Sequence, residues 1–103
     1  MNQRPRRNRL NPAIRGMISE SQVNPANLVG PAFVQEGKNL RSPIASMPGI
    51  SRLSIDQLVA DCQRAFDLGV PAVALFPVVE ESLKNSEGKE SLNPNGLLQR
   101  SVK

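Results

Sequence analysis

Residues 54–79 of the chain read SIDQLVADCQRAFDLGVPAVALFPVV. In the first half of this stretch, apolar residues recur at the spacing of one helix face. These residues are Ile55, Leu58, Val59, Cys62 and Phe66. Ser54 and Gln57 have the spacing of a capping box, which satisfies the free N–H groups at a helix start. The pattern predicts a helix over residues 55–68, with Cys62 as a small core residue rather than a reactive thiol.

The second half of the stretch predicts a buried strand. Gly69 suits the position that follows a helix, and Pro71 cannot continue one. Residues 72–79 are apolar on both alternating faces, as in a parallel strand covered on both sides. A second apolar run of strand length lies upstream at residues 28–34. Gly30-Pro31 inside that run favours a strand that starts a sheet or carries a bulge.

A strand, a helix and a second strand in this order form one right-handed βαβ unit. The Gly-, Ser- and Pro-rich loop before the helix contains residues 40–44 and 50–53, which could pair as a small hairpin. A polar loop follows the second strand, and residues 96–103 begin an amphipathic helix. Because two parallel strands cannot cover both faces of residues 72–79, we expect the front part of a larger α/β protein, or a unit that needs partners.

Three Asn-Pro pairs punctuate the chain, at residues 11–12, 24–25 and 93–94. Each offers an N-cap side chain followed by a proline at the first helical position. The first pair precedes apolar residues at helical spacing and predicts a short helix. The second pair predicts only a turn.

The positive charge is concentrated at the N-terminus. Five arginines precede the first acid, Glu20, whereas residues 20–103 hold eight basic and nine acidic residues. We therefore expect a basic arm over residues 1–24, either solvated or paired with carboxylates on a neighbouring subunit. Nucleic-acid binding is less favoured, because residues 1–32 contain no aromatic side chain for stacking and no helix-turn-helix or zinc spacing follows.

The composition excludes much ordinary chemistry. The 103 residues contain no His and one Cys, which excludes Ser-His-Asp and Cys-His triads and a His/Cys metal cage built from this chain alone. A single thiol cannot form an internal disulfide, so we expect a reducing, cytoplasmic setting. No membrane association is expected, because the longest apolar run, residues 70–79, is about half the length of a membrane span.

The remaining candidate groups have polar surroundings. A Schiff-base lysine needs burial or a neighbouring cation, and neither is evident for Lys38, Lys84, Lys89 or Lys103. The acids Glu80, Glu81, Glu87 and Glu90 follow the second strand and could hold a hard cation or transfer protons. A charged run in such a loop is more typical of a solvent-facing surface.

Several blocks of sequence occur in an order that resembles a known family. They are Arg4–Arg7, Asn24–Val29, Pro31–Val34, Ser46–Ile50, Arg52–Ser54, Gly69–Val78 and Asn93–Leu97. Together they resemble the N-terminal third of the porphobilinogen synthase family, also called delta-aminolevulinic acid dehydratase, in its bacterial form.

The resemblance implies an α/β fold, the N-terminal part of a TIM (β/α)8 barrel preceded by an extended N-terminal arm. About two barrel strands would lie in residues 25–103. It implies a lyase that condenses two 5-aminolevulinate molecules to porphobilinogen, with loss of two waters, in tetrapyrrole and haem biosynthesis. It also implies two Schiff-base lysines on later strands, a zinc or magnesium ion, and a homo-octamer or hexamer in which the arm wraps a neighbouring subunit.

Few functional residues of that family fall within this chain. By resemblance, Arg4, Arg6, Arg7 and Arg9 belong to the subunit-contact arm. Phe76 would end the second strand and line the substrate pocket, or serve ordinary barrel packing. No lysine here matches a Schiff-base position, and neither catalytic residues nor metal ligands are expected. We expect the isolated chain to be inactive; the alternative is a non-catalytic assembly piece that acts through its basic arm.

Overall fold

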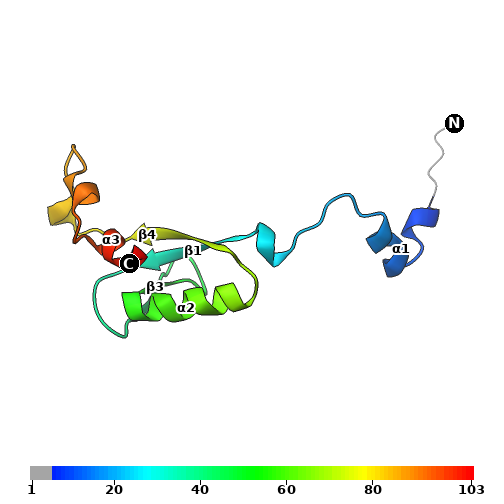
Figure 1. Cartoon of the computed structure of the whole chain (residues 1–103), viewed down its shortest axis with the longest axis horizontal. Coiled ribbons are helices and arrows are strands. Elements are labelled where there is room, and N and C mark those ends of the chain that lie inside the picture. The colour runs from blue at the N-terminus through cyan, green and yellow to red at the C-terminus, as the bar shows by residue number, and fades with distance from the viewer. Residues whose placement is uncertain (1–5) are drawn as a thin grey trace.

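The computed structural model describes residues 6–103, which form a small sheet with helices on one face and a long N-terminal arm (Figure 1). The helices are α1 (Pro12–Met17), α2 (Ile55–Asp67) and α3 (Leu97–Val102). The strands are β1 (Val29–Val34), β2 (Arg41–Pro43), β3 (Ser51–Leu53) and β4 (Ala72–Pro77). Single turns of 3-10 helix cover Arg7–Arg9, Pro25–Asn27, Glu81–Leu83 and Lys89–Leu92. No helix in this part of the chain is long and apolar enough to cross a membrane.

The four strands form one sheet in the order β2-β3-β1-β4. β1 and β4 pair in parallel along their full lengths, from Val29 opposite Ala72 to Val34 opposite Pro77. The hairpin β2-β3 is antiparallel, as predicted. It also joins the sheet, since β3 pairs in parallel with the last two residues of β1. This extension of the sheet was not predicted.

Pro31 is tolerated in β1 because only one neighbour pairs with it. Opposite Pro31 lies Ala74 of β4, whereas β3 reaches only Phe33 and Val34. Proline cannot donate to a ladder, and the short hairpin requires no such bond at this position. β1 is thus internal to the sheet at its carboxyl end only.

The core lies between the sheet and the helices α2 and α3. Its buried members are Val34, Leu53, Leu58 and Leu97, with exposed fractions from 0% to 8%. Each comes from a different element: β1, β3, α2 and α3. Cys62 packs against this cluster, which confirms its prediction as a core residue.

Residues 72–79 are not covered on both faces within the described residues, as expected of a unit whose two parallel strands cannot enclose them. None of the six residues of β4 is buried. Helices α2 and α3 lie on one face of the sheet (Figure 1), and no described element covers the other face. Two further residues of the predicted helix face are also exposed, Val59 by 60% and Phe66 by 69%.

Helix α2 begins at Ile55 and ends as predicted, but its N-terminal capping differs from the prediction. Its last carbonyls accept from the N–H groups of Gly69 and Val70 at 2.9 and 3.0 Å, and Gly69 has a φ of +89°. This is the Schellman arrangement, which needs a left-handed residue and therefore favours glycine. The predicted capping box is absent, because the Ser54 side chain makes no capping hydrogen bond.

The side chains that should have formed this box bind the hairpin instead. The Ser54 Oγ accepts from the Leu40 N–H at 2.9 Å and donates to Asp56 Oδ1 at 2.6 Å. Gln57 Nε2 donates to Asn39 Oδ1 at 2.8 Å. A tertiary contact with the chain entering β2 has therefore displaced the local capping bonds.

Two of the three Asn-Pro predictions are confirmed. Asn11 caps α1 through its side chain, which accepts from the Ile14 N–H at 2.9 Å. Asn24 starts a single 3-10 turn. The third pair caps no helix: Asn93 Oδ1 accepts from the Asn95 N–H at 3.0 Å, which forms a turn. Helix α3 begins after Gly96, within the predicted residues 96–103.

The arm gives the molecule its length. The described residues extend over 66 × 32 × 27 Å, and α1 lies far from the sheet at the end of an extended segment (Figure 1). From residue 6 to residue 24 only Ile14 is partly buried. The arm therefore offers its side chains to solvent or to another molecule.

Candidate functional site at the carboxyl ends of the strands

Two phenylalanines mark the sheet face that the helices leave open. Phe33 of β1 and Phe76 of β4 are ladder partners, and their ring centroids lie 5.5 Å apart with a 32° tilt. The next ladder pair, Val34 and Pro77, points toward the helices, since successive side chains alternate between faces. Phe76 remains 49% exposed.

The aromatic pair lies where α/β proteins place their sites. β1 and β4 are parallel and end at Val34 and Pro77, so their carboxyl ends meet at one edge of the sheet. Binding and catalytic residues of parallel α/β folds gather at that edge. Phe76 therefore lies at the expected end of its strand, whereas its role in a substrate pocket stays a prediction.

Polar groups continue the same face beside Phe33. Arg52 of β3 is the ladder partner of Phe33, and Ser42 of β2 is the ladder partner of Arg52. Gln35 Nε2 donates to Ser42 Oγ at 2.9 Å and to the Arg52 carbonyl at 3.0 Å. The carboxyl edge thus carries an aromatic half and a polar half.

Sequence reasoning missed the polar half of this edge. Arg52 lies between Ser51 and Leu53 in a loop assigned only to a hairpin. A single charged residue preceding a core leucine was a usable signal, because alternation in a strand sends the two side chains to opposite faces. What the sequence did not provide was the register that sets Arg52 beside Phe33.

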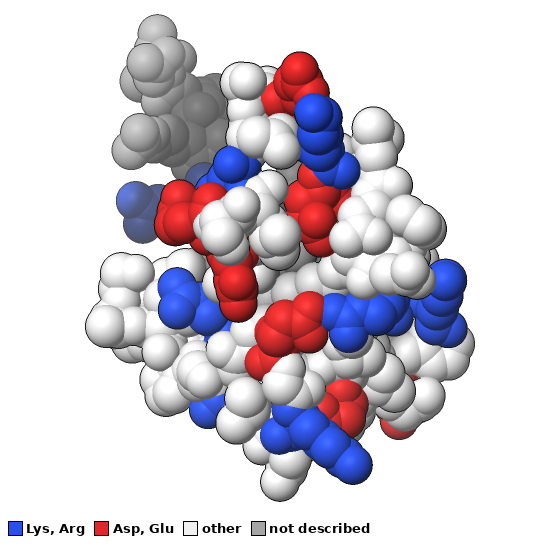
Figure 2. All heavy atoms as spheres, turned by 90° about the vertical axis from the view of Figure 1, so that its left-hand side faces the viewer, with Lys and Arg blue, Asp and Glu red and all other residues white. Residues whose placement is uncertain are grey.

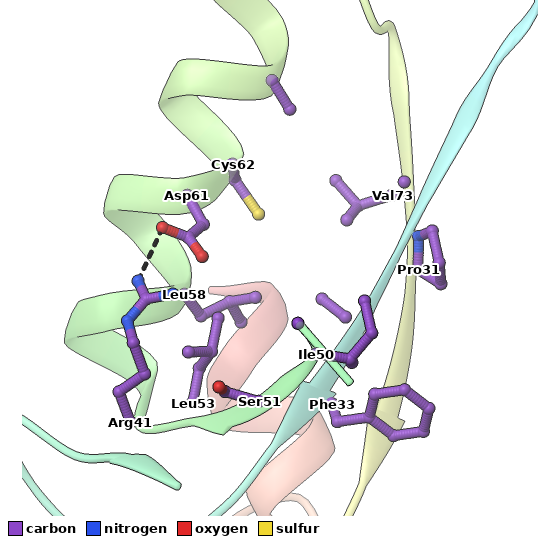
Figure 3. A pocket seen from close by; sticks show the side chains of 14 residues that line it. Pro31, Phe33, Arg41, Ile50, Ser51, Leu53, Leu58, Asp61, Cys62 and Val73 are labelled. Carbon is purple, nitrogen blue, oxygen red and sulfur yellow. Dashed lines mark hydrogen bonds and ion pairs between the residues drawn. The ribbon is translucent and has the colours of Figure 1, made fainter. Parts of the chain in front are cut away.

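The helix side of the sheet contains a cavity of about 170 Å³ (Figure 3). Figure 3 shows Cys62 pointing into it from α2, with Leu53, Leu58 and Val73 around it. At its rim, Arg41 pairs with Asp61 at 2.8 Å, and Asp61 also pairs with Arg64. A larger apolar cavity of about 470 Å³ lies between α2 and α3.

These cavities offer packing space rather than chemistry. Cys62 is the one thiol of the chain, and a nucleophilic thiol needs a base or a cation to hold it as thiolate. The charged groups at the rim already pair with each other. No group of three metal-ligating side chains occurs among residues 6–103 that could hold an ion.

The lysines and acids of the polar loop neutralise one another at the surface. Lys84 pairs with Glu81, and Lys89 pairs with Glu87 at 2.7 Å. Acidic and basic side chains alternate over this end of the molecule rather than forming a patch of one sign (Figure 2). All four lysines are exposed, as expected of solvated charges.

One carboxylate has a shifted pKa. The hydrogen bond from the Ser54 hydroxyl lowers the pKa of Asp56, and the Asn39 N–H acts in the same direction. That N–H lies 3.1 and 2.9 Å from the two carboxylate oxygens. Asp56 thus works as an anion that holds the hairpin entry to α2, just beyond the carboxyl end of β3.

The arm arginines lie apart from this edge. Arg6, Arg7 and Arg9 are exposed and form no ion pair with any described acid. Arg4 lies outside the described residues. The structure therefore brings none of Arg6, Arg7 and Arg9 to Phe76, and the role of the four arginines in subunit contact stays a prediction.

The fold and the site together define a class of protein. A parallel strand-helix-strand unit has its helices on one sheet face and an aromatic and polar row at the carboxyl edge of the other. Such a unit is characteristic of an α/β protein with a ligand site at the ends of its strands.

Comparison with known proteins identifies the family. The sequence model of delta-aminolevulinic acid dehydratase matches residues 2–103, and the chain belongs to this family. The dehydratase of Bradyrhizobium diazoefficiens is 45% identical over 97% of this chain and 28% of its own length. That of Chlamydia pneumoniae is 39% identical over 99% of this chain and 31% of its own length.

A solved structure has the same local fold. The delta-aminolevulinic acid dehydratase (porphobilinogen synthase) of Toxoplasma gondii, crystallised with the reaction product porphobilinogen, matches with a TM-score of 0.88. The sequences are 43% identical, and the match covers 99% of this chain and 29% of that chain. The chain thus spans less than a third of the length of these relatives.

Proposed function

We propose that these 103 residues are the N-terminal segment of a porphobilinogen synthase, a lyase that condenses two 5-aminolevulinate molecules and releases two waters. The observation that carries the proposal is the family match over residues 2–103. The structure supports the proposal through its match with a relative crystallised with porphobilinogen, which covers 99% of this chain. The pathway served would be tetrapyrrole and haem biosynthesis.

The proposed architecture is a TIM barrel of which β1 and β4 are neighbouring strands. In such a barrel, helices cover the outer face and side chains fill the interior. The face with Phe33 and Phe76 would then be the interior, and their edge would be the catalytic end. This assignment explains why β4 is apolar on both faces although only one face is covered here.

The segment would contribute a pocket wall rather than the reacting groups. Phe76 would line the substrate pocket, with Phe33 packed against it at 5.5 Å. The exposed lysines have none of the burial that depresses an amine pKa for Schiff-base formation. We therefore assign that chemistry to parts of the protein outside these residues, and expect the isolated chain to be inactive.

The metal of the proposed enzyme, zinc or magnesium, does not fit the described residues. Magnesium needs several oxygen ligands, and zinc needs three or four sulfur, nitrogen or oxygen ligands in a tetrahedral arrangement. Residues 6–103 provide no cluster of three or more such ligands. We derive no step of the reaction through a metal held by this chain.

The basic arm supports an assembly role. Its exposed arginines and extended shape suit contact with a neighbouring subunit, in a homo-octamer or a hexamer. The single thiol supports a cytoplasmic location, and neither nucleic acid nor a membrane is proposed as a partner. The alternative function is that of a non-catalytic assembly piece that acts through this basic arm.

A chimera tests the proposal directly. Residues 1–103 would replace the matching segment of the Bradyrhizobium diazoefficiens dehydratase, and porphobilinogen would be measured by its colour reaction. The chimera should form porphobilinogen from 5-aminolevulinate, whereas the purified 103-residue chain should not. Turnover by the isolated chain would refute its inactivity. A soluble, assembled chimera without turnover would favour the alternative function.

A further inference from the structure

We propose that Asn95 is a site of spontaneous deamidation whose rate is controlled by the start of α3. The site is the peptide between Asn95 and Gly96, the one Asn-Gly pair of the sequence, at the junction of the polar loop and α3. The inference goes beyond the proposed function and does not depend on it. The reaction consumes only water, so the chain needs no enzyme or cofactor for it.

The reaction begins within the Asn95-Gly96 peptide. The Gly96 nitrogen loses its proton and attacks Asn95 Cγ, the Cγ–Nδ2 bond breaks, and the amide leaves with a proton as ammonia. Water then opens the resulting five-membered succinimide at one of its two carbonyls, which gives aspartate or isoaspartate. Glycine favours the ring closure, because it has no Cβ in the way and allows the widest backbone rotation.

The other asparagines of the chain are less suited to this reaction. Three of them precede proline, at residues 11, 24 and 93, and a proline nitrogen has no proton to lose. Asn85 lies in the same loop as Asn95, but its Oδ1 accepts from two backbone N–H groups, both at 3.1 Å, and Ser86 follows it. The Asn95 side chain is exposed, and no described group forms a hydrogen bond with it.

The folded chain holds both polar groups of the Asn95-Gly96 peptide. The Gly96 N–H donates to the Asn93 carbonyl at 2.9 Å, and the Asn95 carbonyl accepts from Arg100 Nε at 3.0 Å. Arg100 is itself held, because its guanidinium also pairs with Glu36 just after β1. The attack needs a free Gly96 nitrogen and a turn of this peptide toward the side chain. Both hydrogen bonds must therefore break first, which couples deamidation to local opening of the chain at α3.

The packing at this junction favours the glycine that makes the pair labile. Gly96 is buried, and a Cβ at this position would lie 3.1 Å from the Asn93 carbonyl oxygen. The next residue, Leu97, is 8% exposed in the core. Isoaspartate adds a methylene to the backbone at residue 95, so it should move the carbonyl away from Arg100 and loosen Leu97. Deamidation would then act as an irreversible destabilising change at the start of α3.

The test follows deamidation of the purified 103-residue chain at mildly alkaline pH, in buffer and in urea. Mass spectrometry of the tryptic peptide 90–100 reports the reaction of Asn95, because Asn93 in the same peptide precedes proline. In buffer, Asn95 should react faster than any other asparagine, but more slowly than in urea. Arg100→Gln, which is analysed as peptide 90–103, should raise the rate in buffer about fivefold, the effect of one lost hydrogen bond.

Three variants serve as controls, and each should keep the circular dichroism spectrum of the wild-type chain. Arg64→Gln removes an exposed arginine that pairs with Asp61 on α2 and should leave the rate within about twofold. Asn95→Gln should form little product, because its longer side chain must close a six-membered ring. Asn95→Asp has the charge of the product with a normal backbone, so its unfolding midpoint should lie closer to that of the wild type than the purified isoaspartate form does.

Three results would overturn the inference. The first is faster deamidation in buffer at an asparagine other than Asn95. The second is an equal rate at Asn95 in buffer and in urea, which would show that the fold does not control the site. The third is a wild-type rate in Arg100→Gln, which would show that its bond to the Asn95 carbonyl does not hold the peptide closed.

Discussion

Ser54 joins the hairpin to α2 through a buried hydroxyl. It is the one buried polar residue in the described part of the chain, with an exposed fraction of 0%. Replacing Ser54 with Ala would leave the Leu40 N–H, now bonded at 2.9 Å, without its side-chain acceptor. Because this hydrogen bond is partly buried, Ser54→Ala should lower the free energy of unfolding by roughly 1 kcal/mol.

Urea unfolding followed by circular dichroism measures this loss. Ser82→Ala is the matched control, since the Ser82 hydroxyl is exposed and lies 3.5 Å from Glu80; it should change the free energy of unfolding by less than about 0.5 kcal/mol. Equal midpoints for the two variants would show that the Leu40 N–H finds another acceptor.

Asp56 makes the same junction sensitive to acid. Its pKa is lowered by the Ser54 hydroxyl and the Asn39 N–H, so the folded chain binds a proton at this carboxyl less readily than the unfolded chain. The resulting stability is therefore present above the ordinary aspartate pKa, about 3.9, and is lost as pH falls through the lowered value. In the wild-type chain, the free energy of unfolding should therefore fall between about pH 5 and pH 3. In Asp56→Asn this fall should be smaller, because the carboxyl that takes up a proton on unfolding is gone.

The control for this pH response is Asp67→Asn. Asp67 is exposed near the other end of α2 and accepts from Gln63 Nε2 at 2.9 Å. Its replacement should preserve the acid-induced fall in stability seen in the wild-type chain. If Asp56→Asn keeps the full fall as well, other carboxylates carry the pH dependence.

Among the elements, α2 shows how a local signal fixes a helix end. Gly69 has a φ of +89°, and a Cβ at this position would lie 3.3 Å from the Pro25 Cβ. An alanine would carry both the left-handed penalty and this close contact, so Gly69→Ala should destabilise the fold by about 1–2 kcal/mol. Chemical denaturation measures the effect.

Gly16→Ala is the contrasting change. Gly16 lies in α1, and nothing would lie within 4 Å of an added Cβ. Alanine is the better helix former by about 1 kcal/mol, so helix content should rise slightly while the unfolding midpoint of the core stays unchanged. A loss of stability as large as that of Gly69→Ala would mean that α1 packs on the core.

The parts of the fold that could be predicted are those with local causes. The end of α2 follows from Gly69 and Val70, and the start of α1 from Asn11, because each motif lies within a few residues. The start of α2 could not be predicted in detail, since Ser54 bonds to Leu40 across the hairpin. Likewise Phe76 could be placed at a strand end, but Arg52 beside Phe33 depends on a register between distant strands.

The molecule as a whole combines a small core with a large uncovered surface. Four side chains from four elements make up the buried apolar core, and the opposite sheet face with Phe33 and Phe76 has no described cover. A barrel would bury this face in its interior. If β4 belongs to such a barrel, one cause explains both its apolar sequence and its exposure in these residues: the cover of this face would come from the rest of the barrel.

The arm gives the last prediction. Arg6, Arg7 and Arg9 are exposed and have no described acid as a partner, so their charge is available to a neighbouring subunit. Changing all three to Gln should shift the protein to smaller assemblies in sedimentation velocity, and should reduce the effect of added salt on assembly. The control changes Arg64, Lys84 and Lys89 to Gln, since these bases already pair within the chain and the net charge changes equally. Equal behaviour of the two triple variants would contradict a specific arm contact and leave net charge as the cause.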